Sequence, residues 1–292
     1  MKSSFFSRLS GDRHGKSISA LFALLLCTPA LSTATITDYN DLDHWLDGAP
    51  KGGSADWTAK DGFQYMIDDN GHGPTGYVSP GWGGQEYDAE AIYINKTANL
   101  LEIAVVTGMH PTAAHTYGPG DIAIDLNYQM NGSASFDIGI VTTGDNAGKI
   151  YQVDAGGWNY GLWNESGGHD PLDPDQAHPT SIKNSSVNSL LGNADAFYYG
   201  EALYDNTSLL QLGEHAGDNH YLIALSIDLN RTDLEFLTNG LEQGAFLAHW
   251  TMNCANDSVE VDPPAGVPEP ASILLVFAGL LGFISFRRFH NS

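Results

Sequence analysis

Hydrophobic and polar residues alternate with a period of two over most of the chain between residues 35 and 262. Such alternation is typical of strands that bury one face, whereas a helix repeats every 3.6 residues. The pattern predicts strands at residues 89–95, 101–105, 122–126, 136–140, 221–229 and 246–252, with Gly, Asn and Asp between them. We therefore expect an all-β fold, a single jelly-roll-like β-sandwich with long loops that covers residues 35–262.

Helical signals are weak in this region. Residues 38–46 and 195–203 favour short helical turns, but no long amphipathic helix and no internal repeat is predicted. Roughly 230 residues are normal for one all-β domain, so no second domain is expected.

Residues 156–190 lack the alternation and combine Gly, Pro, Asn and Asp with three aromatic residues, Trp158, Tyr160 and Trp163. A loop this long is often functional, and exposed aromatic rings stack on the apolar faces of sugars. These three residues are therefore a candidate ligand-binding set. The alternative is that they cover a sheet edge or belong to the core.

The first 34 residues have the pattern of a secretory signal peptide. Lys2, Arg8, Arg13 and Lys16 form a basic leader, residues 18–27 are apolar, and small residues end at Ala34. This order is typical of export, which places the mature chain outside the cytoplasm.

The last 30 residues divide into a linker with a Pro-Glu-Pro motif at 263–270 and an apolar stretch with a basic end at 271–292. Residues 271–286 would rise about 24 Å as a helix, slightly less than the ~30 Å hydrocarbon core. We predict a transmembrane helix whose flanking arginines lie on the cytoplasmic side, and an ordinary single-pass anchor is the alternative. The residues that carry this pattern are Val267, Pro268, Glu269, Pro270, Arg287 and Arg288.

The order of Pro-Glu-Pro motif, short hydrophobic helix and basic cluster resembles the PEP-CTERM sorting signal of Gram-negative bacteria. The resemblance implies that an exosortase, a membrane enzyme, processes the tail near the motif. It also implies transient anchoring in the inner membrane, followed by transfer to the cell surface or extracellular matrix. The exosortase and, before processing, the membrane are the expected partners.

Three segments of the predicted sandwich, residues 84–93, 119–125 and 249–257, are similar to segments of other exported bacterial and archaeal proteins of this sorting class. The first two, with the strand between them, also look like the opening strands of carbohydrate-binding sandwiches of the family-9 and DOMON type. This second resemblance implies a sandwich fold and leaves function open.

The chain is strongly acidic, with a formal net charge of -23 at pH 7, and 33 of its 35 acids but only 6 of its 12 Lys and Arg lie between residues 35 and 266. Because nucleic-acid binding requires a basic surface, this balance argues against a nucleic-acid partner. Cys27 leaves with the signal peptide, so Cys254 remains alone and cannot form an internal disulfide.

Acidic residues in separate loops are candidate ligands for a structural Ca²⁺, which takes six to eight oxygen atoms. None of them has EF-hand spacing, and scattered Asp residues often only solvate loops. Glu90 is expected on the face of Ile92 and Ile94, where Asp121, His249 or a metal would partner its carboxylate. The alternative, which we favour, is a hydrogen-bonded carboxylate at the start of a strand. The candidate metal ligands are Asp68, Asn70, Glu86, Asp88, Glu90 and Asp121.

No nucleophile elbow, phosphate loop or paired-Cys knuckle is found in the sequence. Cys254 and His249 would face opposite sides of one strand, which is unsuitable for a nucleophile and its base. We expect a non-enzymatic structural or interaction protein of the cell surface or matrix. The alternative is an exopolysaccharide-binding module, and a third hypothesis is a secreted glycoside hydrolase, because two facing carboxylates would suffice.

Overall fold

The computed structural model describes residues 39–50, 57–67, 84–112, 116–128, 136–154, 156–164, 177–183, 187–209, 219–243, 245–255 and 257–262. The predicted signal peptide, the linker with its Pro-Glu-Pro motif and the predicted transmembrane helix lie outside these residues. Within the described ranges, no helix is long and apolar enough to span a bilayer.

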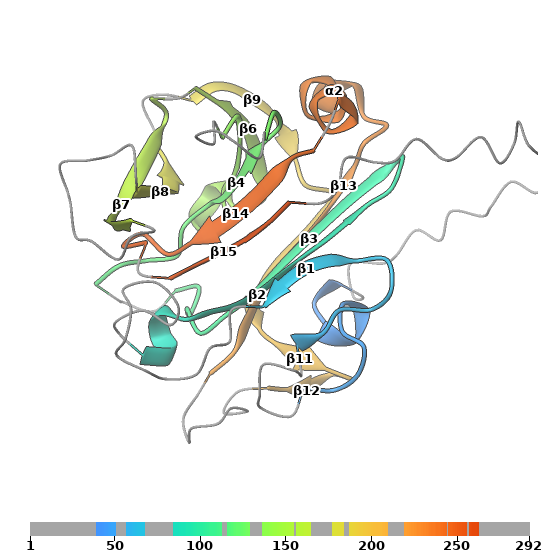
Figure 1. Cartoon of the computed structure of the whole chain (residues 1–292), viewed down its shortest axis with the longest axis vertical. Coiled ribbons are helices and arrows are strands. Elements are labelled where there is room, and N and C mark those ends of the chain that lie inside the picture. Colours follow the sequence, from blue (N-terminus) through green and yellow to red (C-terminus); the bar gives the residue numbers. More distant parts are fainter. Residues whose placement is uncertain are drawn as a thin grey trace, which may run out of the picture. The chain divides into compact units, whose positions relative to one another are not determined.

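Five antiparallel strands form the first sheet, sheet A, in the order β1-β2-β3-β13-β10 (Figure 1). The helical turn predicted at 195–203 is wrong, because residues 196–201 pair with β13 along their whole length and form the edge strand β10. The bounds are β1 Gln64–Ile67, β2 Ala89–Lys96, β3 Leu100–Thr107, β10 Ala196–Glu201 and β13 Tyr221–Asp228.

Six antiparallel strands form the second sheet, sheet B, in the order β15-β14-β4-β5-β6-β9. The chain passes from sheet A to sheet B twice, from β3 to β4 and from β13 to β14. β3 and β13 are neighbours in sheet A, and β4 and β14 are neighbours in sheet B. The bounds are β4 Ile122–Asp125, β5 Ile138–Ile140, β6 Lys149–Val153, β9 Val187–Asn193, β14 Leu247–Thr251 and β15 Ser258–Val261.

The main hydrophobic core lies between the two sheets. Alternate residues of each strand supply it, so the period of two in the sequence corresponds to burial of one strand face. This confirms the predicted all-β sandwich and the six strands expected from the alternation. The core residues of β2, β3, β4 and β13 are Ile92, Ile94, Leu101, Ile103, Val105, Ile122, Ile124, Ile223, Leu225 and Ile227.

The outer faces of β2, β3 and β13 in sheet A are also buried, beneath the segment made of residues 39–50 and 57–63 (Figure 1, blue). A short 3-10 turn at Leu42–His44 confirms the helical turn predicted near residues 38–46. We call this segment the N-terminal cover. The cover and the strand face beneath it share a second core cluster that contains Tyr39, Leu42, Trp45, Leu46, Trp57, Ala91, Tyr93, Ala104, Val106, Leu222 and Ala224.

A two-residue hairpin closes one side of this cover. Strands β11 (Leu203–Tyr204) and β12 (Thr207–Ser208) are joined by Asp205 and Asn206, whose positive φ angles suit a tight turn. The Asp41 carboxylate accepts hydrogen bonds from the backbone N–H of both turn residues, at 3.0 and 2.6 Å. A carboxylate of the cover thus fixes a turn that lies far along the chain.

The outer face of sheet B is covered by a β-hairpin made of β7 (Trp158–Asn164) and β8 (Ala177–Ile182), drawn in yellow-green in Figure 1. Ala123, Val153 and Trp158 form a small core cluster there, with Ile182 packed against it. The prediction that residues 156–190 form one irregular loop is therefore wrong, since β7, β8 and the start of β9 occupy much of it. We call this hairpin the β7–β8 cover.

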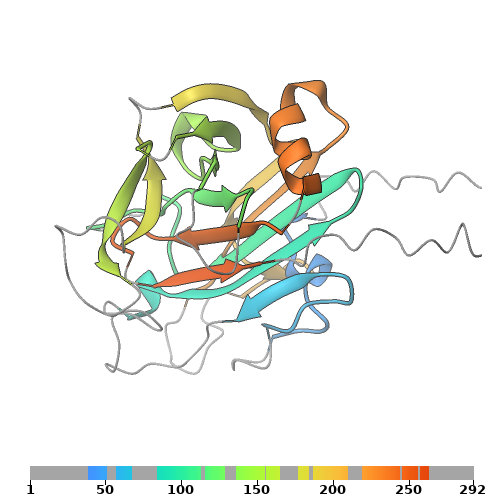
Figure 2. The ribbon, with the colours of Figure 1, turned by 45° about the horizontal axis from the view of Figure 1, so that its top comes forward.

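One α-helix, α2 (Glu235–Gln243), connects β13 to β14 after a 3-10 turn at Thr232–Leu234. Leu234 of the turn and Leu237 and Leu241 of the helix reach the main core, with the 3-4 spacing of an amphipathic helix. Gly240 allows a close approach, because a Cβ there would lie 2.4 Å from Leu126 Cδ1. Figure 2 shows the helix near β9.

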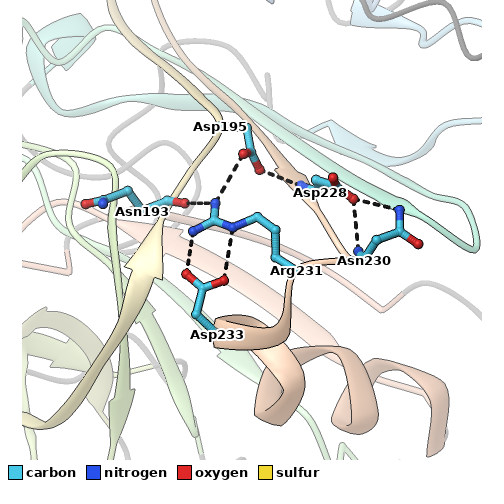
Figure 3. A network of polar contacts seen from close by, with 6 residues as sticks. All are labelled: Asn193, Asp195, Asp228, Asn230, Arg231 and Asp233. Atoms are coloured by element: carbon cyan, nitrogen blue, oxygen red, sulfur yellow. Dashed lines mark hydrogen bonds and ion pairs between the residues drawn. The ribbon is translucent and has the colours of Figure 1, made fainter.

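Arg231, the one arginine between residues 35 and 286, joins the two sheets near α2 (Figure 3). Its guanidinium donates to Asn193 O at the end of β9 (2.6 Å), to Asp195 Oδ1 (3.2 Å) and to Asp233 Oδ2 (2.6 Å). Asp195 Oδ2 in turn accepts the backbone N–H of Asp228 at 2.6 Å. Bidentate pairing explains why an arginine is suited to this position.

Candidate functional site

The three segments that the sequence singled out, residues 84–93, 119–125 and 249–257, meet at one end of the sandwich. Asp257 Oδ2 accepts the backbone N–H of Ala89 at 2.6 Å, which joins β15 of sheet B to β2 of sheet A. Trp250 Nε1 donates to Gly120 O at 3.1 Å, and Asn253 N donates to Gly118 O at 2.9 Å. We call this place the motif junction.

Glycine at position 120 lets the backbones of the motif junction approach one another. A Cβ on Gly120 would lie 2.0 Å from Thr251 O and 2.4 Å from Thr180 O, distances that no side chain tolerates. Packing therefore requires a glycine at position 120, because only a residue without a side chain leaves room for these two carbonyl groups. Asp121 follows it directly in the chain.

Asp121 anchors the β7–β8 cover to sheet B. Its Oδ1 accepts the Thr142 N–H at 3.1 Å and its Oδ2 accepts the Ile182 N–H at 2.9 Å. Burial raises the pKa of Asp121 to about 6, although these two N–H donors act in the opposite direction. Both oxygens are thus engaged with backbone amides, a structural role for a residue predicted as a metal ligand.

Glu90 lies at a β-bulge at the start of β2, where the register shifts between Ala89 and Ala91. Its Oε1 is 3.1 Å from His220 Nε2 and accepts a 2.6 Å hydrogen bond from Gln85 Nε2. The expected orientation toward Ile92 and Ile94 is wrong, because a bulge breaks the alternation of side chains. Glu90 instead meets His220 on the cover side of sheet A, and neither Asp121 nor His249 is its partner.

Trp57 completes this buried group, with its ring centroid 5.2 Å from that of His220. Glu90 and His220 side chains are both 4% exposed, so the pair is sealed beneath the N-terminal cover. A buried carboxylate needs such a partner, and a hydrogen-bonded imidazole supplies it.

The remaining predicted metal ligands do not converge in the described part of the chain. Glu86 is exposed, whereas Asp88 is buried and its backbone oxygen accepts bonds from Thr107 Oγ1 (2.5 Å) and Gly108 N (2.9 Å). Asp68 and Asn70 lie outside the described residues. Among the residues that are described, no three His, Cys, Asp or Glu side chains form a group that could hold a metal ion.

The predicted aromatic ligand-binding set is divided by the fold. Trp158 is 1% exposed and its Nε1 donates to Phe136 O at 2.9 Å, so it packs inside the β7–β8 cover and the ligand-binding prediction for it is wrong. Tyr160 is 38% exposed and lies where the register between β7 and β8 shifts. Trp163 lies in β7, and its side chain is outside the described part.

A second aromatic group lies next to the motif junction, and the sequence did not reveal it. Tyr117 is 36% exposed, and its ring centroid is 6.5 Å from that of Tyr87. At the neighbouring start of β13, the Tyr221 ring is 4.9 Å from the ring of His110. We call this group the tyrosine patch; with the two exposed carboxylates near it, its members are Glu86, Tyr87, His110, Tyr117, Glu201 and Tyr221.

Two carboxylates influence the centre of this patch. Burial raises the pKa of Tyr221, and the charges of Glu201 and Glu86 raise it further. Glu201 is the cross-strand neighbour of Tyr221 in β10, and Thr107 of β3 is its neighbour on the other side. The patch draws its residues from five separate segments, so only the fold places them together.

Comparison with known proteins identifies the tail. Residues 266–288 match the family model described as the PEP-CTERM protein-sorting motif. No curated protein matches the chain, and nothing in these comparisons supports the similarity to family-9 or DOMON modules. The match covers the residues predicted to carry the signal, and it supports exosortase-dependent processing of an exported protein at the membrane.

Proposed function

We propose that this chain is a non-enzymatic interaction protein that an exosortase releases from the inner membrane to the cell surface or extracellular matrix of a Gram-negative bacterium. The sorting motif at residues 266–288 is the observation that carries the proposal. The acidic sandwich that precedes it is the part that remains outside the membrane after processing.

The buried carboxylates support a non-enzymatic role. Asp121 and Asp257 accept backbone N–H groups, and Glu90 is paired with His220 and Gln85 beneath a tryptophan. A hydrolase of the predicted third class would need two carboxylates that face each other across a substrate. These three instead hold strands and covers together.

Deletion of residues 267–292 tests the sorting step. The truncated protein should accumulate in the periplasm or medium, because both the motif and the apolar stretch are gone. A second variant, with Pro268, Glu269 and Pro270 all replaced by Ala, keeps the apolar stretch and should remain unprocessed in the membrane fraction. Fractionation with antibody detection on intact cells measures both. Surface display of either variant at the wild-type level would refute the proposal.

A further inference from the structure

The tyrosine patch combines exposed aromatic surface with carboxylates on a rigid base. Tyr117, 36% exposed, presents its ring beside the partly buried Tyr87. Tyr221 is only 8% exposed and packs against His110, so this pair supports the surface from below. The base is fixed by Tyr199, whose hydroxyl donates to Met109 O at 2.8 Å, and by the bonds of the motif junction. A preformed surface of this kind binds a ligand without first having to order itself.

The chemistry of the patch fits a saccharide. Tyrosine rings stack on the apolar C–H faces of sugar rings, and carboxylates accept hydrogen bonds from sugar hydroxyls. Glu201, the cross-strand neighbour of Tyr221, and Glu86, which precedes Tyr87, are both exposed and supply such acceptors. The imidazole of His110 and the phenol groups add further polar atoms.

The negative charge of the domain favours neutral saccharides over anionic ones. Between residues 35 and 266 the chain has 33 acids and 6 Lys or Arg, and the patch itself holds two carboxylates. Uronic-acid or sulfated polymers would be repelled by this surface, whereas a neutral polymer has no such penalty.

The C-terminal strand runs away from the motif junction. β15 starts beside the junction, because Asp257 binds Ala89, and it extends from Ser258 to Val261. These residues carry the chain about 10 Å away from the junction before the linker begins.

We infer that the tyrosine patch is a binding site for a neutral polysaccharide outside the cell. The inference rests on the proposed function, since it names the ligand class of the proposed interaction protein. The site differs from the one that the sequence predicted, because Tyr160 lies on the β7–β8 cover and Trp158 is buried within it.

Affinity electrophoresis of the full chain tests the site, in a zwitterionic detergent without a sugar headgroup. The gels contain a neutral polymer (β-glucan, xylan or galactomannan) or a uronic-acid polymer (alginate or polygalacturonate). At least one neutral polymer should retard the wild type. Tyr117→Ala and Glu201→Gln should each raise the dissociation constant about tenfold, as expected for loss of one stacking or one charge-assisted contact.

Matched tyrosines serve as controls. Tyr65 is 40% exposed on β1 outside the patch, and Tyr65→Ala should bind like the wild type. Tyr160→Ala separates the two sites: loss of binding there, with Tyr117→Ala unaffected, would overturn the inference. Retardation by the uronic-acid polymers alone, or by no polymer, would also overturn it. Surface localisation of the same strain is scored separately, so a failed sorting step is distinguished from a failed site.

Discussion

The two outer faces of the sandwich are both covered, but by different means. The N-terminal cover lies on sheet A through large aromatic residues, and His44 Nε2 joins it to Glu102 Oε1 of β3 at 3.1 Å. The β7–β8 cover lies on sheet B through the smaller cluster of Trp158. Asp121 fixes it by accepting the backbone N–H of Ile182, and its other oxygen accepts the N–H of Thr142 after β5. One buried carboxylate therefore has an imidazole partner and the other has only amides.

This difference gives the two carboxylates opposite pKa shifts. Burial by itself would raise the pKa of Glu102, yet hydrogen bonds from His44 and Asn95 outweigh it and hold the pKa below its usual value. Burial dominates at Asp121 and raises its pKa to about 6. The two pKa values shift in opposite directions because side-chain hydrogen bonds outweigh burial at Glu102, whereas the two backbone N–H donors do not outweigh it at Asp121.

Loss of a tryptophan should have the largest effect and should separate the two covers. Trp45 is fully buried among Tyr39, Phe63 and Tyr93, so Trp45→Ala should lower the free energy of unfolding by about 5 kcal/mol. Trp158→Ala, in the smaller cluster, should cost about 3 kcal/mol. Urea denaturation measures both values.

Limited proteolysis shows which cover each substitution opens. Trp45→Ala should expose cleavage sites within residues 39–67, and Trp158→Ala should expose sites within residues 156–183. If either variant opens both covers together, the covers are one cooperative unit and the comparison fails.

Asp121→Asn should remove a pH dependence that is specific to the β7–β8 cover. The pKa of Asp121 is about 6 in the folded protein, above the value of 3.8 that we take for the unfolded chain. Ionisation of Asp121 therefore opposes folding. The wild type should therefore lose about 3 kcal/mol as pH rises from below 3.8 to above 6. The variant should lack this slope, although loss of one acceptor lowers its baseline by about 1 kcal/mol. Urea denaturation across pH 3.5–8 measures the slope, and the exposed Asp154→Asn should retain it.

Glu102→Gln should act with the opposite sign. The pKa of Glu102 is depressed in the folded protein, so its contribution is complete above the usual pKa and is lost as pH falls through the depressed value. At pH 7 the variant should be about 2 kcal/mol less stable, the range for a hydrogen bond to a charged group.

The decrease in the free energy of unfolding at acidic pH, the acid limb of the stability curve, distinguishes the variants more clearly than stability at pH 7. It should flatten in Glu102→Gln and persist in Glu235→Gln, an exposed position on α2. An unchanged acid limb in Glu102→Gln would show that His44 does not fasten the cover through this carboxylate.

The sequence predicted the sandwich because alternation reports directly on strands with one buried face, as at Ile122 and Ile124. It did not predict that the outer faces are covered, which explains the error at Trp158, or the bulge in β2, which explains the error at Glu90. An aromatic residue on a covering hairpin is buried by a distant sheet, and a bulge reverses a side chain without any change in composition.

Tertiary pairing accounts for the other differences. Residues 196–201 form β10 because β13 is available beside them, a long-range effect that local propensity does not contain. The helix α2 did have a signal, the spacing of Leu234, Leu237 and Leu241 after Thr232 and Asp233. Tyr117 and Tyr221 had none, since only the fold brings their segments to one end of sheet A.

Binding of Ca²⁺ should have the smallest effect on stability, and it concerns sheet A alone. Asp68 directly follows Ile67, the last residue of β1 in sheet A, so a Ca²⁺ bound through Asp68 and Asn70 would act on that sheet. At a calcium concentration ten times the dissociation constant, binding would add about 1.4 kcal/mol. EDTA should then lower the melting temperature, and excess Ca²⁺ but not Mg²⁺ should restore it. Hydrogen exchange should quicken in β1 and stay constant in β7 and β8. If EDTA did not change the melting temperature, the prediction of a structural Ca²⁺ would be wrong. If hydrogen exchange became faster in both covers, the ion would not be bound beside β1.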